Sequence, residues 1–431
     1  MLHPCLDINN ENHLTIGGVD TVEIAKEYGT PVYVMDEQTI RNNCREYKNA
    51  LERSFGKGSM PLYASKAFSC KRVYEIVAEE GIGVDVVSGG ELYTAYKAGF
   101  PMEKVYFHGN NKTESDIELA LDCKIGCFVV DNTDELMSVN EHAAKRGITQ
   151  KILLRITPGI DPHTHKAIVT GSVDSKFGTA IETGQALEIV KKAISLSNVH
   201  LEGLHCHIGS QIFDCDPFVE AADIMVRFIK QIKDETGFEI ETLNLGGGFA
   251  SRYLDTDPVI SYSDNIDKMA ETIKKQVIDN DIKQPRILME PGRSLVASSG
   301  ITLYTVGSVK EITGFKNYVS IDGGMPDNPR YALYQSVYSA LIANRAKDTP
   351  NYECTIAGRC CESGDLIAEN IKLASPKRND VLAVLTTGAY NYSMASHYNR
   401  LPKPPVIMVA NNNTYVAVRR ETFDDIIRND L

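Results

Sequence analysis

Met60–Phe68 (MPLYASKAF) predicts a short apolar strand that ends at Lys66, and residues 70–77 open a helix directly behind it. The charge of a lysine at the end of a buried strand is costly to desolvate unless the ammonium has a partner or loses its proton. A lysine amine that loses its proton is a nucleophile able to form a Schiff base. The alternative is a strand end that has reached solvent, and the segment alone favours that alternative. The rest of the chain decides between the two.

The bulk composition is that of a globular protein with more than one domain. The chain has 431 residues, a length that predicts about two or three domains. Hydrophobic residues make up 43% and charged residues 24% of it, values typical of soluble proteins. The formal net charge of −12 argues against nucleic acid or an anionic membrane surface as the main partner.

The sequence shows no targeting or membrane signal. No apolar run approaches the roughly 20 residues of a membrane span, and the first residues lack the basic and apolar regions of a signal peptide. We therefore expect a cytoplasmic protein. Its ten cysteines include two close pairs, Cys123 with Cys127 and Cys360 with Cys361, but no zinc-site spacing. We expect reduced, mostly structural cysteines and no metal.

From Met60 onward, short apolar runs alternate with amphipathic helical segments. One of these segments, at residues 113–120, opens with a capping-box pattern at Thr113. The eight apolar runs are Leu62–Ser65, Gly83–Val87, Lys104–His108, Cys127–Asp131, Ile152–Ile156, Leu201–His207, Glu241–Leu245 and Ile287–Glu290. This alternation is typical of a closed (β/α)₈ barrel, which we expect over residues 36–297. A doubly wound open sheet is the alternative, but the count of eight and the lack of a glycine-rich turn after the first strand favour the barrel.

After Pro291 the pattern becomes rich in strands. The runs are Ile301–Glu311, Tyr318–Asp322, Tyr352–Ala357, Asp380–Thr387, Pro405–Ala410 and Thr414–Arg420. Turn residues separate them, and a helix at residues 422–427 closes the chain. We predict a second, all-β domain over residues 298–431. The strands within residues 1–35 have no helical partners of their own, so we expect them to join this β domain.

Polar, titratable or glycine residues follow nearly every predicted barrel strand. In a (β/α)₈ enzyme the active site lies at the carboxyl ends of the strands. The residues at those ends are Lys66, Asp85, residues 88–91, residues 108–112, Arg155, residues 205–211, residues 246–248 and residues 290–293. Chance placement of so many such residues on one rim is improbable, so we expect the active site there.

The chemistry of these residues points to one cofactor. The bare backbone of Gly246–Gly248 can approach a phosphate closely, with Ser210 adding a donor, although a tight turn is the plainer interpretation. His207 could lie flat on an aromatic ring or be an ordinary core histidine. Glu290 could face a ring nitrogen or form a structural pair with Arg293. A Schiff-base lysine, a phosphate site and an acid at a pyridine nitrogen are together the requirements of pyridoxal phosphate.

Several motifs resemble those of one family. They are Tyr63–Ala67, His205–Gln211, Gly246–Gly248 and Glu290–Arg293 in the barrel, and Arg330–Tyr334, Cys361–Asp365 and Gly388–Tyr390 in the β domain. They resemble the pyridoxal-phosphate decarboxylases with an alanine-racemase-like fold, and among these most closely the diaminopimelate decarboxylases. The resemblance covers nearly the whole chain. Tyr331 is a departure, because many relatives have proline there, and it leaves the local backbone less certain.

The resemblance implies a role for each matching residue. Lys66 would hold the cofactor and Glu290 would face its pyridine nitrogen, while His207 would stack on its ring. Further contacts to the cofactor, mainly to its phosphate, would come from Asp85, Ser210, Gly247, Gly248 and Tyr390. Substrate would be bound by Arg293, Arg330, Tyr334, Glu362 and Tyr390. Cys361 would be the acid that reprotonates the α-carbon, although from the residues alone it reads as an ordinary cysteine.

The family also implies an assembly and a substrate. Its active site is completed by the partner chain of a homodimer, so Cys361 and Glu362 would act across the interface and a monomer would be inactive. Arginine suits the carboxylate of an amino-acid substrate, and Glu362 suits its ammonium group. The reaction implied is decarboxylation of meso-diaminopimelate to L-lysine and carbon dioxide, the last step of lysine biosynthesis.

Three other functions stay open at this point. A decarboxylase of the same fold could act on ornithine, arginine or carboxynorspermidine. A racemase is a second alternative, but Glu290 argues against it, because a racemase is better served by a weaker electron sink. A non-catalytic homologue that binds partners is the third, and the presence of Lys66, Glu290 and Cys361 together argues against it.

Overall fold

The computed structural model describes residues 3–160 and 174–431. The chain forms two compact units. The barrel unit comprises Asn43–Ala250 and Ile260–Gly292, and the β unit comprises Met1–Asn42, Ser251–Val259 and Arg293–Leu431. The domain bounds predicted at residues 35 and 297 stay a prediction.

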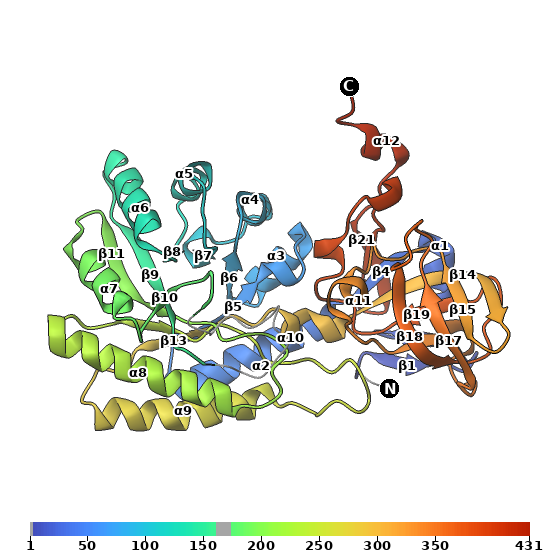
Figure 1. The fold of residues 1–431 in the computed structure, drawn as a ribbon, viewed down its shortest axis with the longest axis horizontal. Helices are drawn as coiled ribbons and strands as arrows, with labels where there is room; N and C mark the ends of the chain where they lie inside the picture. Colours follow the sequence, from blue (N-terminus) through green and yellow to red (C-terminus); the bar gives the residue numbers. More distant parts are fainter. Residues whose placement is uncertain (1–2, 161–173) are drawn as a thin grey trace. The chain divides into compact units, whose positions relative to one another are not determined.

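The barrel unit is a closed ring of eight parallel strands (Figure 1). In ring order the strands are β5 (Met60–Ala64), β6 (Gly83–Val86), β7 (Val105–Phe107), β8 (Cys127–Val130), β9 (Gln150–Thr157), β11 (Val199–His205), β12 (Thr242–Asn244) and β13 (Arg286–Met289). The register pair of Leu288 with Met60 joins β13 to β5 and closes the ring. The predicted barrel is therefore confirmed, and the open sheet is excluded.

Amphipathic helices alternate with these strands and lie outside them (Figure 1). They are α2 (Glu37–Phe55), α3 (Lys71–Glu79), α4 (Gly89–Lys97), α5 (Glu114–Asp122), α6 (Thr133–Lys145), α7 (Gln185–Ser195), α8 (Asp216–Thr236) and α9 (Tyr262–Asp279). The capping box predicted at Thr113 is present: the Thr113 hydroxyl accepts from Asp116 N–H, and the Asp116 carboxylate accepts from Thr113 N–H. Short elements add η1 (Ser65–Ala67), η2 (Met102–Lys104) and β10 (Thr179–Ala180), which pairs with β9.

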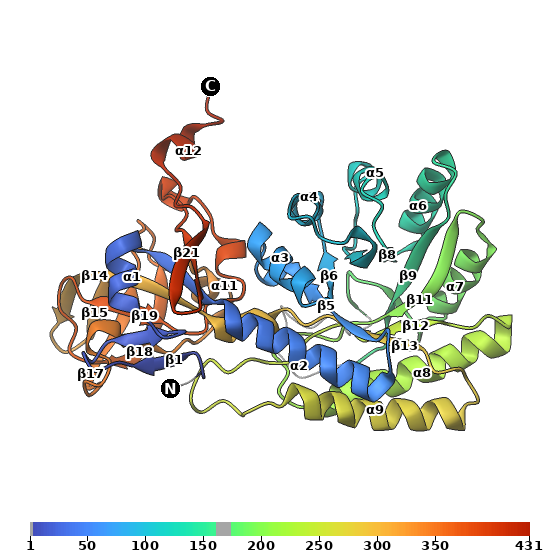
Figure 2. The same cartoon turned by 180° about the vertical axis from the view of Figure 1, so that it is seen from behind.

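The β unit is built around a nine-stranded sheet, seen from behind in Figure 2. Its strands are β4 (Val32–Asp36), β14 (Gly300–Ile312), β15 (Lys316–Ile321), β16 (Ala340–Ile342), β17 (Tyr352–Ala357), β18 (Leu366–Leu373), β19 (Val381–Val384), β20 (Val406–Ala410) and β21 (Asn413–Val418). Strand β4 lies between β14 and β20, antiparallel to the first and parallel to the second. An N-terminal strand therefore joins the sheet of the C-terminal segment, as expected.

The reason β4 is held there is its apolar content. Val32 and Val34 are fully buried and belong to one cluster with Ile301, Leu303 and Ile407. Burial of such side chains contributes about 1.5–3 kcal/mol each relative to exposure. A small sheet of β1 (Leu6–Ile8), β2 (Leu14–Ile16) and β3 (Val19–Asp20) adds Leu14 and Ile16 to the same core.

The β unit also carries short helices. They are α1 (Thr21–Tyr28), α10 (Arg293–Val296), η4 (Ala297–Ser299), α11 (Arg330–Tyr334), η5 (Ala343–Arg345), η6 (Tyr392–Met394), η7 (Tyr398–Arg400) and α12 (Phe423–Ile427). Within the described ranges, no helix of either unit is both long and apolar enough to cross a membrane. All ten cysteines are free thiols.

Candidate active site

Lys66 lies on the η1 turn that follows β5, at the carboxyl end of the barrel strands. Its side chain is exposed, whereas Ser65 and Ala67 on either side are buried. Two bonds fix the turn: Ser65 Oγ donates to Glu91 Oε2 at 3.0 Å, and Ala64 N–H donates to the Pro291 carbonyl at 3.1 Å. A rigid backbone therefore presents a free lysine at the rim.

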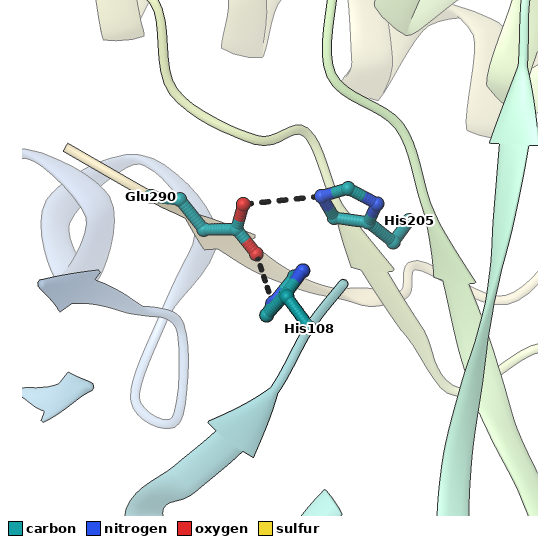
Figure 3. A group of neighbouring side chains, drawn as sticks. All are labelled: His108, His205 and Glu290. Atoms are coloured by element: carbon teal, nitrogen blue, oxygen red, sulfur yellow. Dashed lines mark hydrogen bonds and ion pairs between the residues drawn. The ribbon is translucent and has the colours of Figure 1, made fainter. Parts of the chain in front are cut away.

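Glu290 follows β13 on the same rim, and its buried carboxylate is surrounded by nitrogen atoms (Figure 3). His108 Nε2 lies 2.8 Å from Oε1, and His205 Nε2 lies 3.1 Å from Oε2. Asn244 Nδ2 donates to Oε1 at 2.6 Å. The nitrogens come from the ends of β7, β11 and β12, so three strands converge on one anion.

The electrostatics of the cluster keep Glu290 ionised. Burial alone would raise the pKa of Glu290, but the neighbouring imidazoles of His108 and, less strongly, His205 outweigh it and hold that pKa well below its ordinary value. Burial lowers the pKa of His205 to about 4. His205 is therefore neutral near pH 7 and donates its Nε2 proton to the carboxylate.

Asp85, at the end of β6, is the second carboxyl group of this rim. Its Oδ1 lies 3.8 Å from His108 Nε2. Burial raises the pKa of Asp85 to about 7, with His108 and Lys66 opposing the rise and Glu290 adding to it. Two neighbouring carboxyl groups whose pKa values move apart are typical of acid–base sites.

His207 and the glycine run form the next part of the rim. Gly247 N–H donates to His207 Nδ1 at 3.3 Å. A Cβ atom added to Gly247 would lie 2.0 Å from the Glu290 carbonyl oxygen, and Gly246 and Gly248 have φ values of +68° and +129°. Close packing and positive φ therefore both require glycine here, and they place the run against Glu290.

The loop that carries Ser210 is bonded to this glycine run. Ile212 N–H donates to the Gly248 carbonyl at 3.0 Å, and Ala250 N–H donates to the Ile212 carbonyl at 3.0 Å. Ser210 is half-buried within that loop. The loop of Ser210 and the end of the glycine run thus lie side by side, and backbone amides beside glycines are suited to an anion such as phosphate.

The charge state of His207 suits contact with an aromatic ring. Burial lowers its pKa well below the ordinary value, and the positive charges of Lys66 and Arg155 lower it further. The imidazole is therefore neutral. A free lysine, an ionised buried carboxylate, a neutral imidazole and a glycine-lined loop all fit pyridoxal phosphate.

A second group of predicted residues lies in the β unit. Arg293 is buried, donates from Nη1 to the Tyr253 hydroxyl at 2.7 Å, and places its guanidinium carbon 4.8 Å from the Tyr390 ring centroid. Arg330 is also buried, with its guanidinium carbon 4.6 Å from the Tyr334 ring and 5.2 Å from the Tyr390 ring. In the described part of the chain Arg330 forms no ion pair, so it is a buried cation suited to an anionic group.

The backbone around Tyr331, left uncertain by the sequence, forms the short helix α11. Pro329 stands at its N-cap position. The Tyr331 hydroxyl donates to Glu369 Oε2 at 2.5 Å. Arg330 and Tyr334 therefore lie at opposite ends of one helical turn.

Cys361 and Glu362 lie on the exposed loop between β17 and β18. Cys361 N–H donates to Asn399 Oδ1 at 2.8 Å, and the Tyr398 hydroxyl donates to Glu362 Oε2 at 3.3 Å. Backbone bonds to the buried Asp365 hold the loop, among them Cys360 N–H to Oδ2 at 2.7 Å. Both predicted residues are exposed to solvent.

The structure thus groups the predicted residues in three places. The barrel rim carries Lys66, Asp85, His207, Ser210, Gly247, Gly248 and Glu290. The β unit carries one cluster of Arg293, Arg330, Tyr334 and Tyr390 and a separate loop with Cys361 and Glu362. Their individual roles stay predictions.

Sequence reasoning assigned no role to His108, His205 or Asn244, although the two histidines were noted at strand ends. Their shared contact with Glu290 depends on the closure of the barrel, which brings together residues far apart in the chain. These three residues share one sequence signal, a polar side chain at the end of a buried strand. That signal does not predict which residue the side chain contacts.

Comparison with known proteins identifies the family of this chain. A family model described as the pyridoxal-binding domain of pyridoxal-dependent decarboxylases matches residues 37–297. The chain is 46% identical to the diaminopimelate decarboxylase of Halalkalibacterium halodurans over 429 residues, covering 100% of this chain and 98% of that protein. It is also 46% identical to the diaminopimelate decarboxylase of Bacillus subtilis, with the same coverage.

A solved structure is similar over the whole chain as well. The diaminopimelate decarboxylase of M. jannaschii, crystallised in complex with L-lysine, superposes with a TM-score of 0.92 at 35% identity, covering 100% of this chain and 99% of that chain. Sequence and structure therefore match along the full length of the relatives, and the chain belongs to the diaminopimelate decarboxylases, within the family of pyridoxal-dependent decarboxylases.

Proposed function

We propose that this protein decarboxylates meso-diaminopimelate to L-lysine and carbon dioxide with pyridoxal phosphate as cofactor. The observation that carries the proposal is the buried carboxylate of Glu290, surrounded by three side-chain nitrogen atoms, on the rim that also presents Lys66. The relatives at 46% identity support the choice of substrate.

The barrel residues account for cofactor binding. When bound, pyridoxal phosphate accepts the electron pair that departing carbon dioxide leaves on the α-carbon. Lys66 would hold the cofactor, and the carboxylate of Glu290 would keep its ring nitrogen protonated. The neutral His207 would contact the ring. Ser210 and the amides of Gly247 and Gly248 would bind the phosphate, with Asp85 and Tyr390 as further contacts.

The β-unit residues account for substrate binding. Arg293 and Arg330 are buried cations that bind a substrate carboxylate, with Tyr334 and Tyr390 beside their guanidinium groups. Glu362 binds the ammonium group at the far end of the substrate. Cys361 donates the proton that replaces carbon dioxide on the α-carbon.

We also propose a homodimer in which Cys361 and Glu362 serve the active site of the partner subunit. Their exposure on an ordered loop supports this assignment, because a catalytic acid must be reachable by the substrate. A monomeric form is then expected to be inactive. The ten free thiols support a cytoplasmic location, where thiols stay reduced.

The decisive experiment measures carbon dioxide release by the purified protein with added pyridoxal phosphate. The protein receives meso-diaminopimelate, L-lysine, L-ornithine and L-arginine in parallel. Release from diaminopimelate alone, with lysine as product, is expected. Release only from another amino acid, or only from carboxynorspermidine in a further assay, would retain the roles of Lys66 and Glu290 and overturn those of Arg330, Tyr334 and Glu362.

A variant separates substrate recognition from cofactor binding. Glu362→Ala is expected to impair turnover of diaminopimelate and to leave the affinity for pyridoxal phosphate unchanged, because Glu362 is assigned only to the substrate. Equal loss of both would count against that assignment. Cofactor affinity is read from the visible absorbance of the bound cofactor.

A further inference from the structure

We propose that His108 is a positioning residue for the reaction: it keeps the carboxylate of Glu290 charged and fixed in the direction of the cofactor ring. The inference deepens the proposed function and rests on it for the identity of the ring.

The geometry places His108 between two carboxyl groups. Its Nε2 atom lies 2.8 Å from Glu290 Oε1 and 3.8 Å from Asp85 Oδ1. Side-chain exposure is 5% for His108, 5% for Asp85 and 7% for Glu290, so little water reaches the group. Figure 3 shows one oxygen of Glu290 in contact with the imidazole of His108 and the other in contact with that of His205.

The three nitrogen partners of Glu290 differ in how they stabilise its negative charge. Asn244 donates a hydrogen bond to Oε1 but carries no charge. His205 donates to Oε2 as a neutral ring, because burial lowers its pKa to about 4. His108 is the strongest of the groups that lower the pKa of Glu290 against the effect of burial.

Other charged or titratable groups also face Glu290 from neighbouring strands, and none replaces His108. Asp85 is a second carboxyl group and cannot stabilise the anion, and Cys206 is a buried thiol whose pKa burial raises to about 12. The guanidinium carbon of Arg155 lies 4.2 Å from the centroid of the Phe177 ring. The groups that act on Glu290 or on which it acts are His108, His205, Asp85, Arg155, Cys206 and His207.

Removal of His108 therefore has a defined consequence. Burial then raises the pKa of Glu290, since the main opposing group is gone and the carboxyl of Asp85 remains near. Once Glu290 is protonated, it is no longer an anion and no longer stabilises the positive charge of a protonated ring nitrogen. The loss grows as the pH falls through the raised pKa and disappears at high pH, where Glu290 is ionised again.

The test compares the dissociation constant for pyridoxal phosphate of His108→Asn with that of wild type between pH 6 and 9. The visible absorbance of the bound cofactor is the readout and needs no turnover. The ionisation of the free cofactor affects both dissociation constants equally, so its effect cancels in their ratio at each pH. The ratio is expected to be near 1 at pH 9 and to rise to about 10–100 at pH 6.

Matched variants show whether the effect belongs to this histidine. His142→Asn removes another buried histidine that is paired with a glutamate, Glu114, outside the rim, and its ratio is expected to stay flat. His205→Asn is expected to show a smaller rise than His108→Asn. His108→Gln serves if His108→Asn does not fold, and thermal unfolding checks each variant.

The outcomes are distinct. A ratio that is raised equally at every pH means a purely structural role for His108 and overturns the inference, as does a ratio of 1 throughout. If wild type itself takes up no pyridoxal phosphate, the proposed function and the inference both fail. With diaminopimelate, His108→Asn is expected to lower kcat more than it changes KM, because His108 touches the cofactor's partner and not the substrate.

Discussion

Lys66 and Lys112 both follow short buried strands on the same barrel rim, yet their surroundings are opposite. Lys112 is 7% exposed, and its ammonium donates to the Gly109 and Val129 carbonyls at 3.0 and 2.7 Å and to Glu135 Oε1 at 2.8 Å. Lys66 is exposed on the η1 turn. One lysine has all its donors occupied, whereas the other is available to a ligand.

The difference shows that one barrel rim can carry both residues that stabilise the fold and residues that bind a ligand. Beside Lys112, Glu135 also accepts from Asp131 N–H at 3.2 Å, so the buried pair ties β7, β8 and α6 together. Beside Lys66, the Asp85 carboxyl is buried with a raised pKa and Glu290 depends on two histidines for its charge. The first region stabilises the fold, and the second retains polar groups that cost stability but serve a ligand.

The largest effect is expected from Lys66→Ala. Turnover of diaminopimelate should fall by several orders of magnitude, because Lys66 is the residue assigned to hold the cofactor. The free energy of unfolding of the apoprotein should change by no more than about 0.5 kcal/mol, as for other exposed positions. The assay is carbon dioxide release together with denaturant unfolding. Retained turnover would make Lys66 an ordinary surface lysine.

Lys112→Met should give the opposite result. It leaves the buried carboxylate of Glu135 without its cation, and breaking such a pair destabilises a fold by about 3–5 kcal/mol. Denaturant unfolding measures the loss, and turnover per folded molecule should be kept. The double variant Lys112→Met with Glu135→Leu should recover most of the stability. Lost turnover at unchanged stability would instead place Lys112 in the chemistry.

The sequence singled out Lys66 through its motif, but it did not show how the surroundings of Lys66 and Lys112 differ, because each lysine follows an apolar run at a strand end. The runs themselves were predictable: strands buried on both faces of a parallel sheet read as continuous apolar segments. Glu135 lies on α6, and its contact with Lys112 depends on how that helix packs. Such tertiary partners carry no local sequence signal.

The same limit applies to the acid on the other side of the rim. Glu290 was predicted from its strand end and from the family's motif, and the structure adds the histidines and the asparagine that hold it. The glycine run was predicted as a phosphate loop or a tight turn. The clash of an added Cβ at Gly247 with the Glu290 carbonyl gives it a packing reason that neither interpretation contained.

A pH series on the apoprotein sharpens the comparison further. The folded-state pKa of Asp85 is about 7, above its ordinary value. The folded state therefore binds more protons than the unfolded chain below pH 7, and stability falls as the pH rises towards 7 and levels off above it. Relative to Asp85→Asn, the unfolding free energy of wild type should drop by about 1–2 kcal/mol between pH 5 and 7. A constant difference across the series would mean that Asp85 is ionised throughout.

The smallest effect is expected at the outer edge of the Lys112 side, where His142 on α6 pairs with Glu114 at the start of α5. His142 is buried, but Glu114 is 70% exposed, so water and salt screen the pair. Glu114→Gln should lower the free energy of unfolding by at most about 1 kcal/mol near pH 6. Addition of 1 M NaCl should abolish most of that difference, whereas the loss in Lys112→Met should survive the salt because its charges are buried. A larger, salt-resistant loss in Glu114→Gln would show that water does not screen the pair of His142 with Glu114. The stability of this side of the rim would then depend on that pair as well as on the pair of Lys112 with Glu135.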